Sequence, residues 1–211
     1  MPRAKGERRL EILKALAQML EAPKWERITT AALAGKLGVS EAALYRHFAS
    51  KAQMYEGLLE FIESSVFSLA NRITEDESDG RRQAEKLIEM LLAFAEKNPG
   101  MVRVMTGDAL VGEHERLQAR MNQFFERFES TLKQSLRAAS DGDAAGRAGT
   151  LLRYSIGCLH QFAKSGFAKK PSESFTAQRR YLLPIGQTKL KHPLNSVKRA
   201  CVRLKVKIHV K

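Results

Sequence analysis

The 211-residue sequence contains little cysteine and has no long hydrophobic run. Its two cysteines, Cys158 and Cys201, are too few for a disulfide framework and lack the spacing of a metal site. The first 20 residues carry charges on both sides of their leucines, which is not the pattern of a signal peptide. Because no apolar run is long enough to cross a bilayer, we expect no membrane anchor and a cytoplasmic location.

The sequence motifs of common enzyme classes are also missing. There is no glycine-rich phosphate loop and no HExxH motif, and His114 has no second metal ligand at helical spacing. No serine or cysteine stands in a motif with a recognisable base. We therefore predict that the chain is not an enzyme and uses neither a metal nor a cofactor.

Positive charge is abundant, with 36 Lys and Arg against 23 Asp and Glu and a net charge of +13. Residues 184–211 supply eight of these charges and contain no acidic residue, so we expect a basic tail there. Residues 1–51 still hold ten Lys or Arg against five Glu. This surplus favours an anionic partner, either nucleic acid or a membrane surface, although the tail lacks the amphipathic helix that membrane binding usually needs.

Apolar residues recur at helical spacing along most of the chain, which predicts an all-α fold. The pattern indicates a first helix over residues 8–21, ended by Pro23, and a helix of about six turns that reaches residue 73. A polar loop, residues 74–80, follows that long helix. Further helices are expected over residues 81–97, 101–110, 113–139 and 144–167.

Two short apolar segments on either side of Gly38 have the spacing of a helix-turn-helix. Thr29 or Thr30 can cap the first helix, and Gly38 suits the left-handed position that closes it. Ser40 stands where a second helix needs its N-cap, with Glu41 in the first turn. Such a motif places its second helix in the major groove of DNA.

The candidate DNA contacts are the polar and small residues of this motif. Base edges are expected to meet the second helix, and phosphates to meet the hydroxyls and cations around it. The full set is Thr29, Thr30, Ser40, Glu41, Ala42, Ala43, Tyr45, Arg46, His47 and Lys51.

The segment "ITTAALAGKLGVSEAALYRHFASK", followed by a long helix, resembles the DNA-binding domain of the TetR family of dimeric bacterial regulators. The segments "EKNPGMVRVMTGDAL" and "LHQFAKSGFAKKPSE" narrow the resemblance to the SlmA family of nucleoid occlusion factors, over residues 6–182. The resemblance implies a helix-turn-helix domain, residues 1–51, joined by a long helix to a helical dimerisation domain, residues 52–183. Residues 184–211 are expected to lie outside it.

The resemblance also implies partners. A homodimer would bind palindromic sites in double-stranded DNA, associate with the nucleoid and prevent the division protein FtsZ from assembling over the chromosome. The short, apolar and acidic FtsZ C-terminal tail would lie between the long helix and the helix that ends at "NPG". The residues implied there are Phe61, Arg72, Met90, Phe94, Lys97 and Asn98.

Some residues allow other interpretations or depart from the family. Phe61 and Phe94 could equally pack in the core, and Leu69 stands where the resemblance leads us to expect a basic residue. Pro184 would end the last helix early.

The alternative function is a ligand-responsive repressor of the TetR type, which would need polar groups converging inside the second domain. The expected interior is mainly Leu, Ile, Met and Phe, with Tyr154 and His160 as exceptions.

Overall fold

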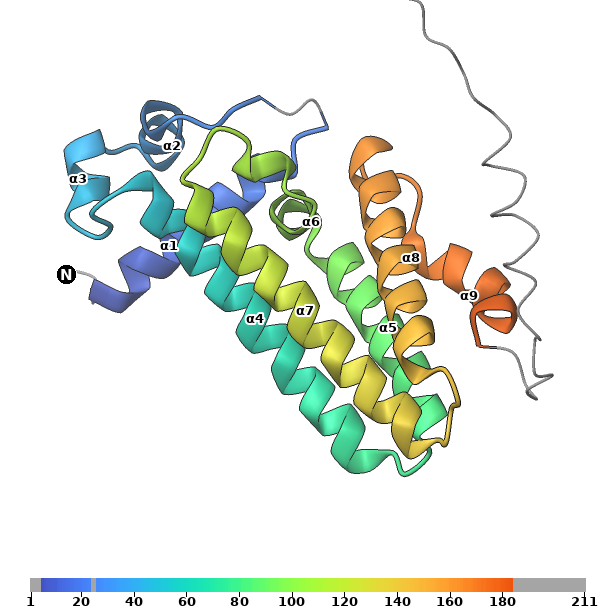
Figure 1. Cartoon of the computed structure of the whole chain (residues 1–211). Coiled ribbons are helices and arrows are strands. Elements are labelled where there is room, and N and C mark those ends of the chain that lie inside the picture. The colour runs from blue at the N-terminus through green and yellow to red at the C-terminus, as the bar shows by residue number, and fades with distance from the viewer. Residues whose placement is uncertain (1–4, 24–25, 184–211) are drawn as a thin grey trace, which may run out of the picture.

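The computed structural model describes residues 5–23 and 26–183, and these residues confirm the all-helical fold with a short N-terminal part and a larger body (Figure 1). In chain order the elements are α1 (Lys5–Leu20), α2 (Thr30–Leu37), α3 (Glu41–Tyr45), α4 (Lys51–Asp76), α5 (Gly80–Lys97), α6 (Pro99–Met105), the 3₁₀ helix η1 (Asp108–Leu110), α7 (Glu115–Ala138), α8 (Ala144–Lys164) and α9 (Pro171–Leu182). The predicted tail, residues 184–211, lies outside the described residues.

Capping residues define the two short helices of the N-terminal part, as predicted. The Thr29 hydroxyl accepts a hydrogen bond from the Ala32 amide at the start of α2, and the Ser40 hydroxyl accepts one from the Ala43 amide at the start of α3. Gly38 ends α2 with φ of 65°, a left-handed conformation that costs glycine nothing. The turn is therefore specified by residues within three positions of each helix end.

The body is a bundle in which α4, α5, α7 and α8 run along one another (Figure 1). Their inward faces are fully buried and apolar, which supplies the main driving force for the packing. Ion pairs add to the contact between α4 and α7: Arg116 bonds Glu56 and Arg120 bonds Glu63, each at 2.6 Å. The fully buried residues of this core include Leu59, Ile62, Val66, Leu87, Leu91, Met121, Phe128, Leu132 and Leu159.

Several predicted boundaries are wrong by a few residues. Helix α4 continues to Asp76, and the predicted loop shrinks because Asp79 accepts hydrogen bonds from two amides at the start of α5. The helix predicted over residues 101–110 is divided into α6 and η1. The predicted helices 113–139 and 144–167 are shorter at one or both ends, as α7 and α8.

The alternative in which Phe61 packs in the core is wrong, and Leu69 also lies outside the core. Phe61 is 46% exposed and Leu69 is 40% exposed. Their neighbours Ile62 and Ala70 are fully buried instead. Periodicity locates an apolar stripe but not its edges, because those depend on which helices pack against it.

Helix α6 joins the N-terminal part to the body. A Cβ built on Gly100 would lie 2.2 Å from the carbonyl oxygen of Ala17, so the backbones of α6 and α1 are in direct contact. Beside it, the buried Arg103 donates hydrogen bonds to the carbonyls of Leu20 at 2.8 Å and Ala22 at 3.0 Å. Burial lowers the pKa of Arg103, and Asp108 opposes that shift. The C-terminal end of α1 is thus tied to α6.

We predict that Gly100→Ala destabilises the protein because the new methyl group must separate α6 from α1. Overpacking of this kind costs ~1–3 kcal/mol. Urea unfolding followed by far-UV circular dichroism, at one fixed protein concentration, would measure the loss. Gly35→Ala is the matched control: nothing lies within 4 Å of its Cβ position on α2, so it should raise the unfolding free energy by up to ~1 kcal/mol. Equal effects of the two changes would contradict the close contact.

Candidate nucleic-acid interface

Helix α3 is held by two buried side chains and exposes the residues between them. Leu44 is 0% exposed and Phe48 is 1% exposed, whereas Tyr45 is 45% exposed and Arg46 is exposed as well. Ser40, Glu41 and Ala42 are also exposed at the start of the helix, and Ala43 is half-buried. The structure therefore brings the predicted contact residues of α3 to one surface.

Arg9 holds the end of α3 against α1. Its Nη1 donates to the carbonyl of His47 at 2.5 Å, and its guanidinium lies 4.2 Å from the centre of the Phe48 ring. The half-buried His47 has a buried Nδ1 atom without a hydrogen-bond partner among the described residues. Sequence reasoning missed Arg9, because no local pattern relates it to a residue 38 positions later.

The two threonines at the start of α2 have different partners. Thr29 is exposed, and its hydroxyl caps α2 while keeping its own hydrogen free to donate. Thr30 donates its hydroxyl hydrogen to the carboxylate of Glu41, which joins α2 to the first turn of α3. Glu41 is therefore a brace within the motif as well as an exposed residue.

Lys51, the first residue of α4, is bound to the body. Its Nζ lies 2.5 Å from Oε1 of Glu113, in the segment between η1 and α7. The same oxygen is 3.6 Å from Nε of Arg27, and Nη2 of Arg27 donates to the Gly112 carbonyl at 2.7 Å. Sequence analysis did not single out Arg27 or Glu113, since 62 residues separate Lys51 from Glu113.

The candidate peptide-binding residues lie on α4 and α5. Phe61 is exposed, and its ring centre is 6.2 Å from that of Phe94, which is only 7% exposed. Met90 is half-buried, Lys97 is exposed, and the Asn98 side chain donates to the Phe94 carbonyl at 2.8 Å. The structure thus places Phe61 of α4 beside Phe94 of α5, and Asn98 bonds back to Phe94.

The sixth candidate, Arg72, is exposed farther along α4. It is 11 residues from Phe61, which corresponds to ~16 Å along the helix and a rotation of only ~20°. Arg72 and Phe61 therefore share one face of α4 but not one contact point. A ligand would have to run along the helix to reach both residues.

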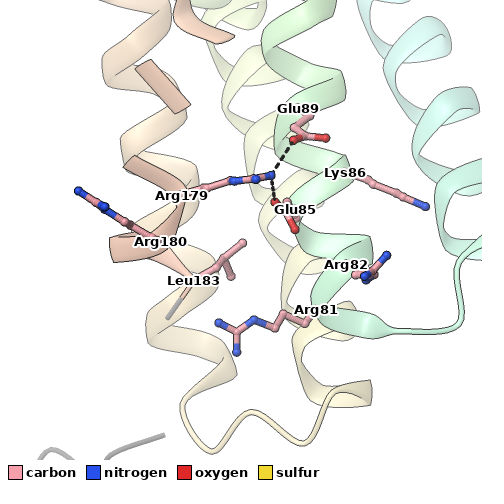
Figure 2. Close-up of a pocket in the computed structure, with 8 residues that line it drawn as sticks. All are labelled: Arg81, Arg82, Glu85, Lys86, Glu89, Arg179, Arg180 and Leu183. Atoms are coloured by element: carbon pink, nitrogen blue, oxygen red, sulfur yellow. Dashed lines mark hydrogen bonds and ion pairs between the residues drawn. The ribbon is translucent and has the colours of Figure 1, made fainter. Parts of the chain in front are cut away.

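A cleft of about 720 Å³ lies between α5 and α9, and Figure 2 shows that its lining is mostly charged. Arg179 reaches across it to Glu85 at 2.7 Å and Glu89 at 3.9 Å. Small-molecule sites in proteins are mostly apolar, with a few converging polar groups. This cleft does not have the character expected for the pocket of a ligand-responsive repressor.

Tyr154 and His160, the two polar residues expected inside the second domain, do not line the cleft between α5 and α9. Tyr154 is half-buried beside Phe175, with ring centres 6.1 Å apart, and burial raises the pKa of its phenol. His160 is half-buried on the same helix, α8. Cys158 is buried, and burial raises the pKa of its thiol. No described helix is long and apolar enough to cross a membrane.

Two family models match the chain. The model described as bacterial regulatory proteins of the tetR family matches residues 12–58, and the SlmA-like model described as a tetracyclin repressor-like C-terminal domain matches residues 81–187. The first match includes the helix-turn-helix and the start of α4. The second includes α7, α8 and α9 and nearly all of α5.

Relatives named nucleoid occlusion factor SlmA are similar over most of their length. The relative from Idiomarina loihiensis is 50% identical over 84% of this chain and 94% of its own length. The relative from Aliivibrio fischeri is 52% identical over 81% of this chain and 91% of its own. Among solved structures, the TetR family transcriptional regulator PfmR from Thermus thermophilus has a TM-score of 0.69 at 20% identity, covering 82% of this chain and 96% of that one. This last similarity supports the fold, and the identities of the relatives support the closer assignment: the chain belongs to the SlmA family of nucleoid occlusion factors, within the TetR family of bacterial regulators.

Proposed function

We propose that this protein is a nucleoid occlusion factor that binds palindromic DNA as a homodimer and, in the DNA-bound form, antagonises FtsZ assembly over the chromosome. The observation that carries the proposal is the surface of α3, where buried Leu44 and Phe48 leave Tyr45 and Arg46 exposed. The similarity to SlmA relatives along the chain supports the second part. In this proposal residues 1–51 bind DNA and residues 52–183 form the dimer and bind FtsZ.

The DNA-binding part rests on local geometry and charge. Helix α3 is short and its N-terminus is exposed, so Ser40, Glu41 and Ala42 can approach base edges in a major groove. Tyr45, Arg46 and the hydroxyl of Thr29 lie where phosphates would flank that groove. A dimer presents two such helices, and a two-fold axis between them matches a palindrome.

The FtsZ part rests on two facing rows of side chains. On α5, Met90, Phe94 and Lys97 follow one another at spacings of four and three residues, so they share a face. On α4, Phe61 and Arg72 share the face described above. The contact between Phe61 and Phe94 provides an apolar floor, and Arg72 and Lys97 add positive charge. An apolar peptide with acidic residues suits this surface of α4 and α5, which we propose as the peptide-binding surface.

The distance between Phe61 and Arg72 along α4 suggests how such a peptide would lie. An extended chain covers at most ~3.3–3.6 Å per residue, so about five extended residues span the ~16 Å from Phe61 to Arg72. A helical peptide would need ~11 residues for the same span. A short tail is sufficient to reach both residues.

We predict that Arg46→Gln weakens DNA binding at all sequences, because it removes a cation from the phosphate-facing surface. The slope of log K against log salt should become shallower by about one for each subunit of the dimer, and the affinity should fall roughly tenfold. Fluorescence anisotropy of a labelled duplex at several salt concentrations would measure both. Arg137→Gln, at the exposed C-terminal end of α7, removes the same charge far from α3 and should change neither.

Tyr45→Phe separates hydrogen bonding from charge in the same assay. Loss of the phenolic hydroxyl should weaken binding and leave the salt slope unchanged, because no cation is removed. If neither Arg46→Gln nor Tyr45→Phe changed the affinity, α3 would not be the DNA-binding surface.

We predict that Lys97→Glu abolishes the effect on FtsZ and leaves DNA binding intact. The substitution places a carboxylate on the proposed peptide-binding surface, where it would repel an acidic peptide. Light scattering of FtsZ polymers, with the bound duplex present, would report the effect. Lys164→Glu is the matched control, since Lys164 is also an exposed lysine at the last position of a helix. If Lys97→Glu lost both DNA binding and the inhibition of FtsZ, the variant would be misfolded, and the assignment of the peptide-binding surface would be contradicted.

A further inference from the structure

A carboxylate from the body occupies the edge of the proposed DNA-binding surface. Glu113 lies in the segment between η1 and α7, and its side chain is only 8% exposed. Its Oε1 is 2.5 Å from Nζ of Lys51 and 3.6 Å from Nε of Arg27. The Gly112 carbonyl, one residue earlier, accepts a further hydrogen bond from Arg27. A single segment of the body thus contacts two cations of the N-terminal part.

The net charge of this cluster is small. Tyr55 lies beside it, with its ring centre 5.7 Å from Nζ of Lys51. Burial and the Glu113 carboxylate raise the pKa of Tyr55, so the phenol stays neutral. Two cations and one carboxylate remain, and the carboxylate cancels one of the two positive charges. A phosphate approaching this edge would meet half of the charge that Lys51 and Arg27 carry.

The same edge is otherwise suited to a phosphate. Lys51 is the first residue of α4, at a helix end where backbone amides and the helix dipole favour an anion. The segment directly before it carries α3 and its exposed residues. The side chain of Arg27 is 62% exposed and that of Lys51 is 20% exposed, so a ligand can reach both from solvent. Glu113 therefore holds the cations at a position that a DNA backbone would compete for.

We propose that Glu113 is an intramolecular competitor of the DNA backbone: its carboxylate pairs with Lys51 and Arg27 in the free protein and cancels half of their charge, and a duplex phosphate displaces it on binding. This inference rests on the proposed DNA-binding function. It makes Glu113 a residue that sets DNA affinity without touching DNA. It also means that DNA binding releases residues 111–114 of the body, a segment in which Val111 is 70% exposed.

The direct test is Glu113→Gln in the full chain, with a labelled duplex of arbitrary sequence as the probe, since phosphate contacts do not depend on sequence. Removal of the competitor should tighten binding about five- to tenfold at the same salt concentration. The slope of log K against log salt should stay near the parent value, because Lys51 and Arg27 contact the same phosphates in both complexes.

Glu115→Gln is the matched control. Glu115 is exposed at the first position of α7, two residues from Glu113, and its replacement removes the same charge from the same region. The affinity should stay near the parent value in this variant. Weaker or unchanged binding by Glu113→Gln, or the same change in both variants, would overturn the proposal.

Lys51→Ala in both backgrounds tests the competition itself. Beside Glu113 the phosphate contact of Lys51 replaces an existing ion pair, so removal of the lysine should lower the affinity little. In the Glu113→Gln background the same removal should lower the affinity about five- to tenfold. Equal changes in the two backgrounds would show that Glu113 and the phosphate do not compete for Lys51.

A measurement on the unmodified chain covers the case in which Glu113→Gln does not fold. Hydrogen–deuterium exchange of the amides of residues 111–114 should become faster when the duplex is added. Slower or unchanged exchange would overturn the proposal. If the parent chain binds no duplex at any salt concentration, the proposed function itself fails; if the parent binds but the Glu113 variants match it, only the competition fails.

Discussion

The guanidinium of Arg103 donates to the last carbonyls of α1, and the position of the DNA-facing helices depends on this contact. A buried cation is costly unless its donors are satisfied, and here two carbonyls at the negative end of a helix dipole satisfy them, with the Phe167 ring 4.8 Å away. Helix α1 connects this contact to α3. Its C-terminal end is held by Arg103, and Arg9, about 16 Å away along the helix, binds the end of α3 through His47 and Phe48. The body therefore orients α3 through two arginines and one helix.

A second attachment between the N-terminal part and the body has a different physical character. The contact of α1 with α6 is buried and includes the backbone approach at Gly100. The contact of Lys51 and Arg27 with Glu113 consists of ion pairs, and the side chains of Arg27 and Lys51 are 62% and 20% exposed. Ion pairs that water can reach weaken with salt and exchange with other anions, whereas close packing of backbones does not. The second contact is therefore the one that depends on salt.

The comparison of sequence and structure shows which physical signals are local. Thr29, Gly38 and Ser40 were predictable because each acts on backbone groups within a few residues, and the whole helix-turn-helix followed from them. The exposure of Tyr45 and Arg46 was predictable from the helical spacing of the apolar residues beside them. Arg9, Arg103 and Glu113 were missed, because their partners lie 38 to 83 residues away and an isolated charge in a sequence reads as a surface residue. The sequence left open whether Phe61 is in the core or at the surface, because only the placement of α5 decides which edge of the apolar stripe is covered.

Very few residues separate the Phe61–Phe94 contact from helix α1, which supports α3. Asn98 closes α5 through its bond to the Phe94 carbonyl, α6 begins at the next residue, and Gly100 already touches α1. Because packed backbones are nearly incompressible, a shift of α1 against the body has to carry α6 and the end of α5 with it or break their contact. Coupling between two sites requires an element whose position both sites sense. The α5–α6 junction has such a position, since Phe94 on one side contacts Phe61 of α4 and Gly100 on the other touches the helix that carries Arg9.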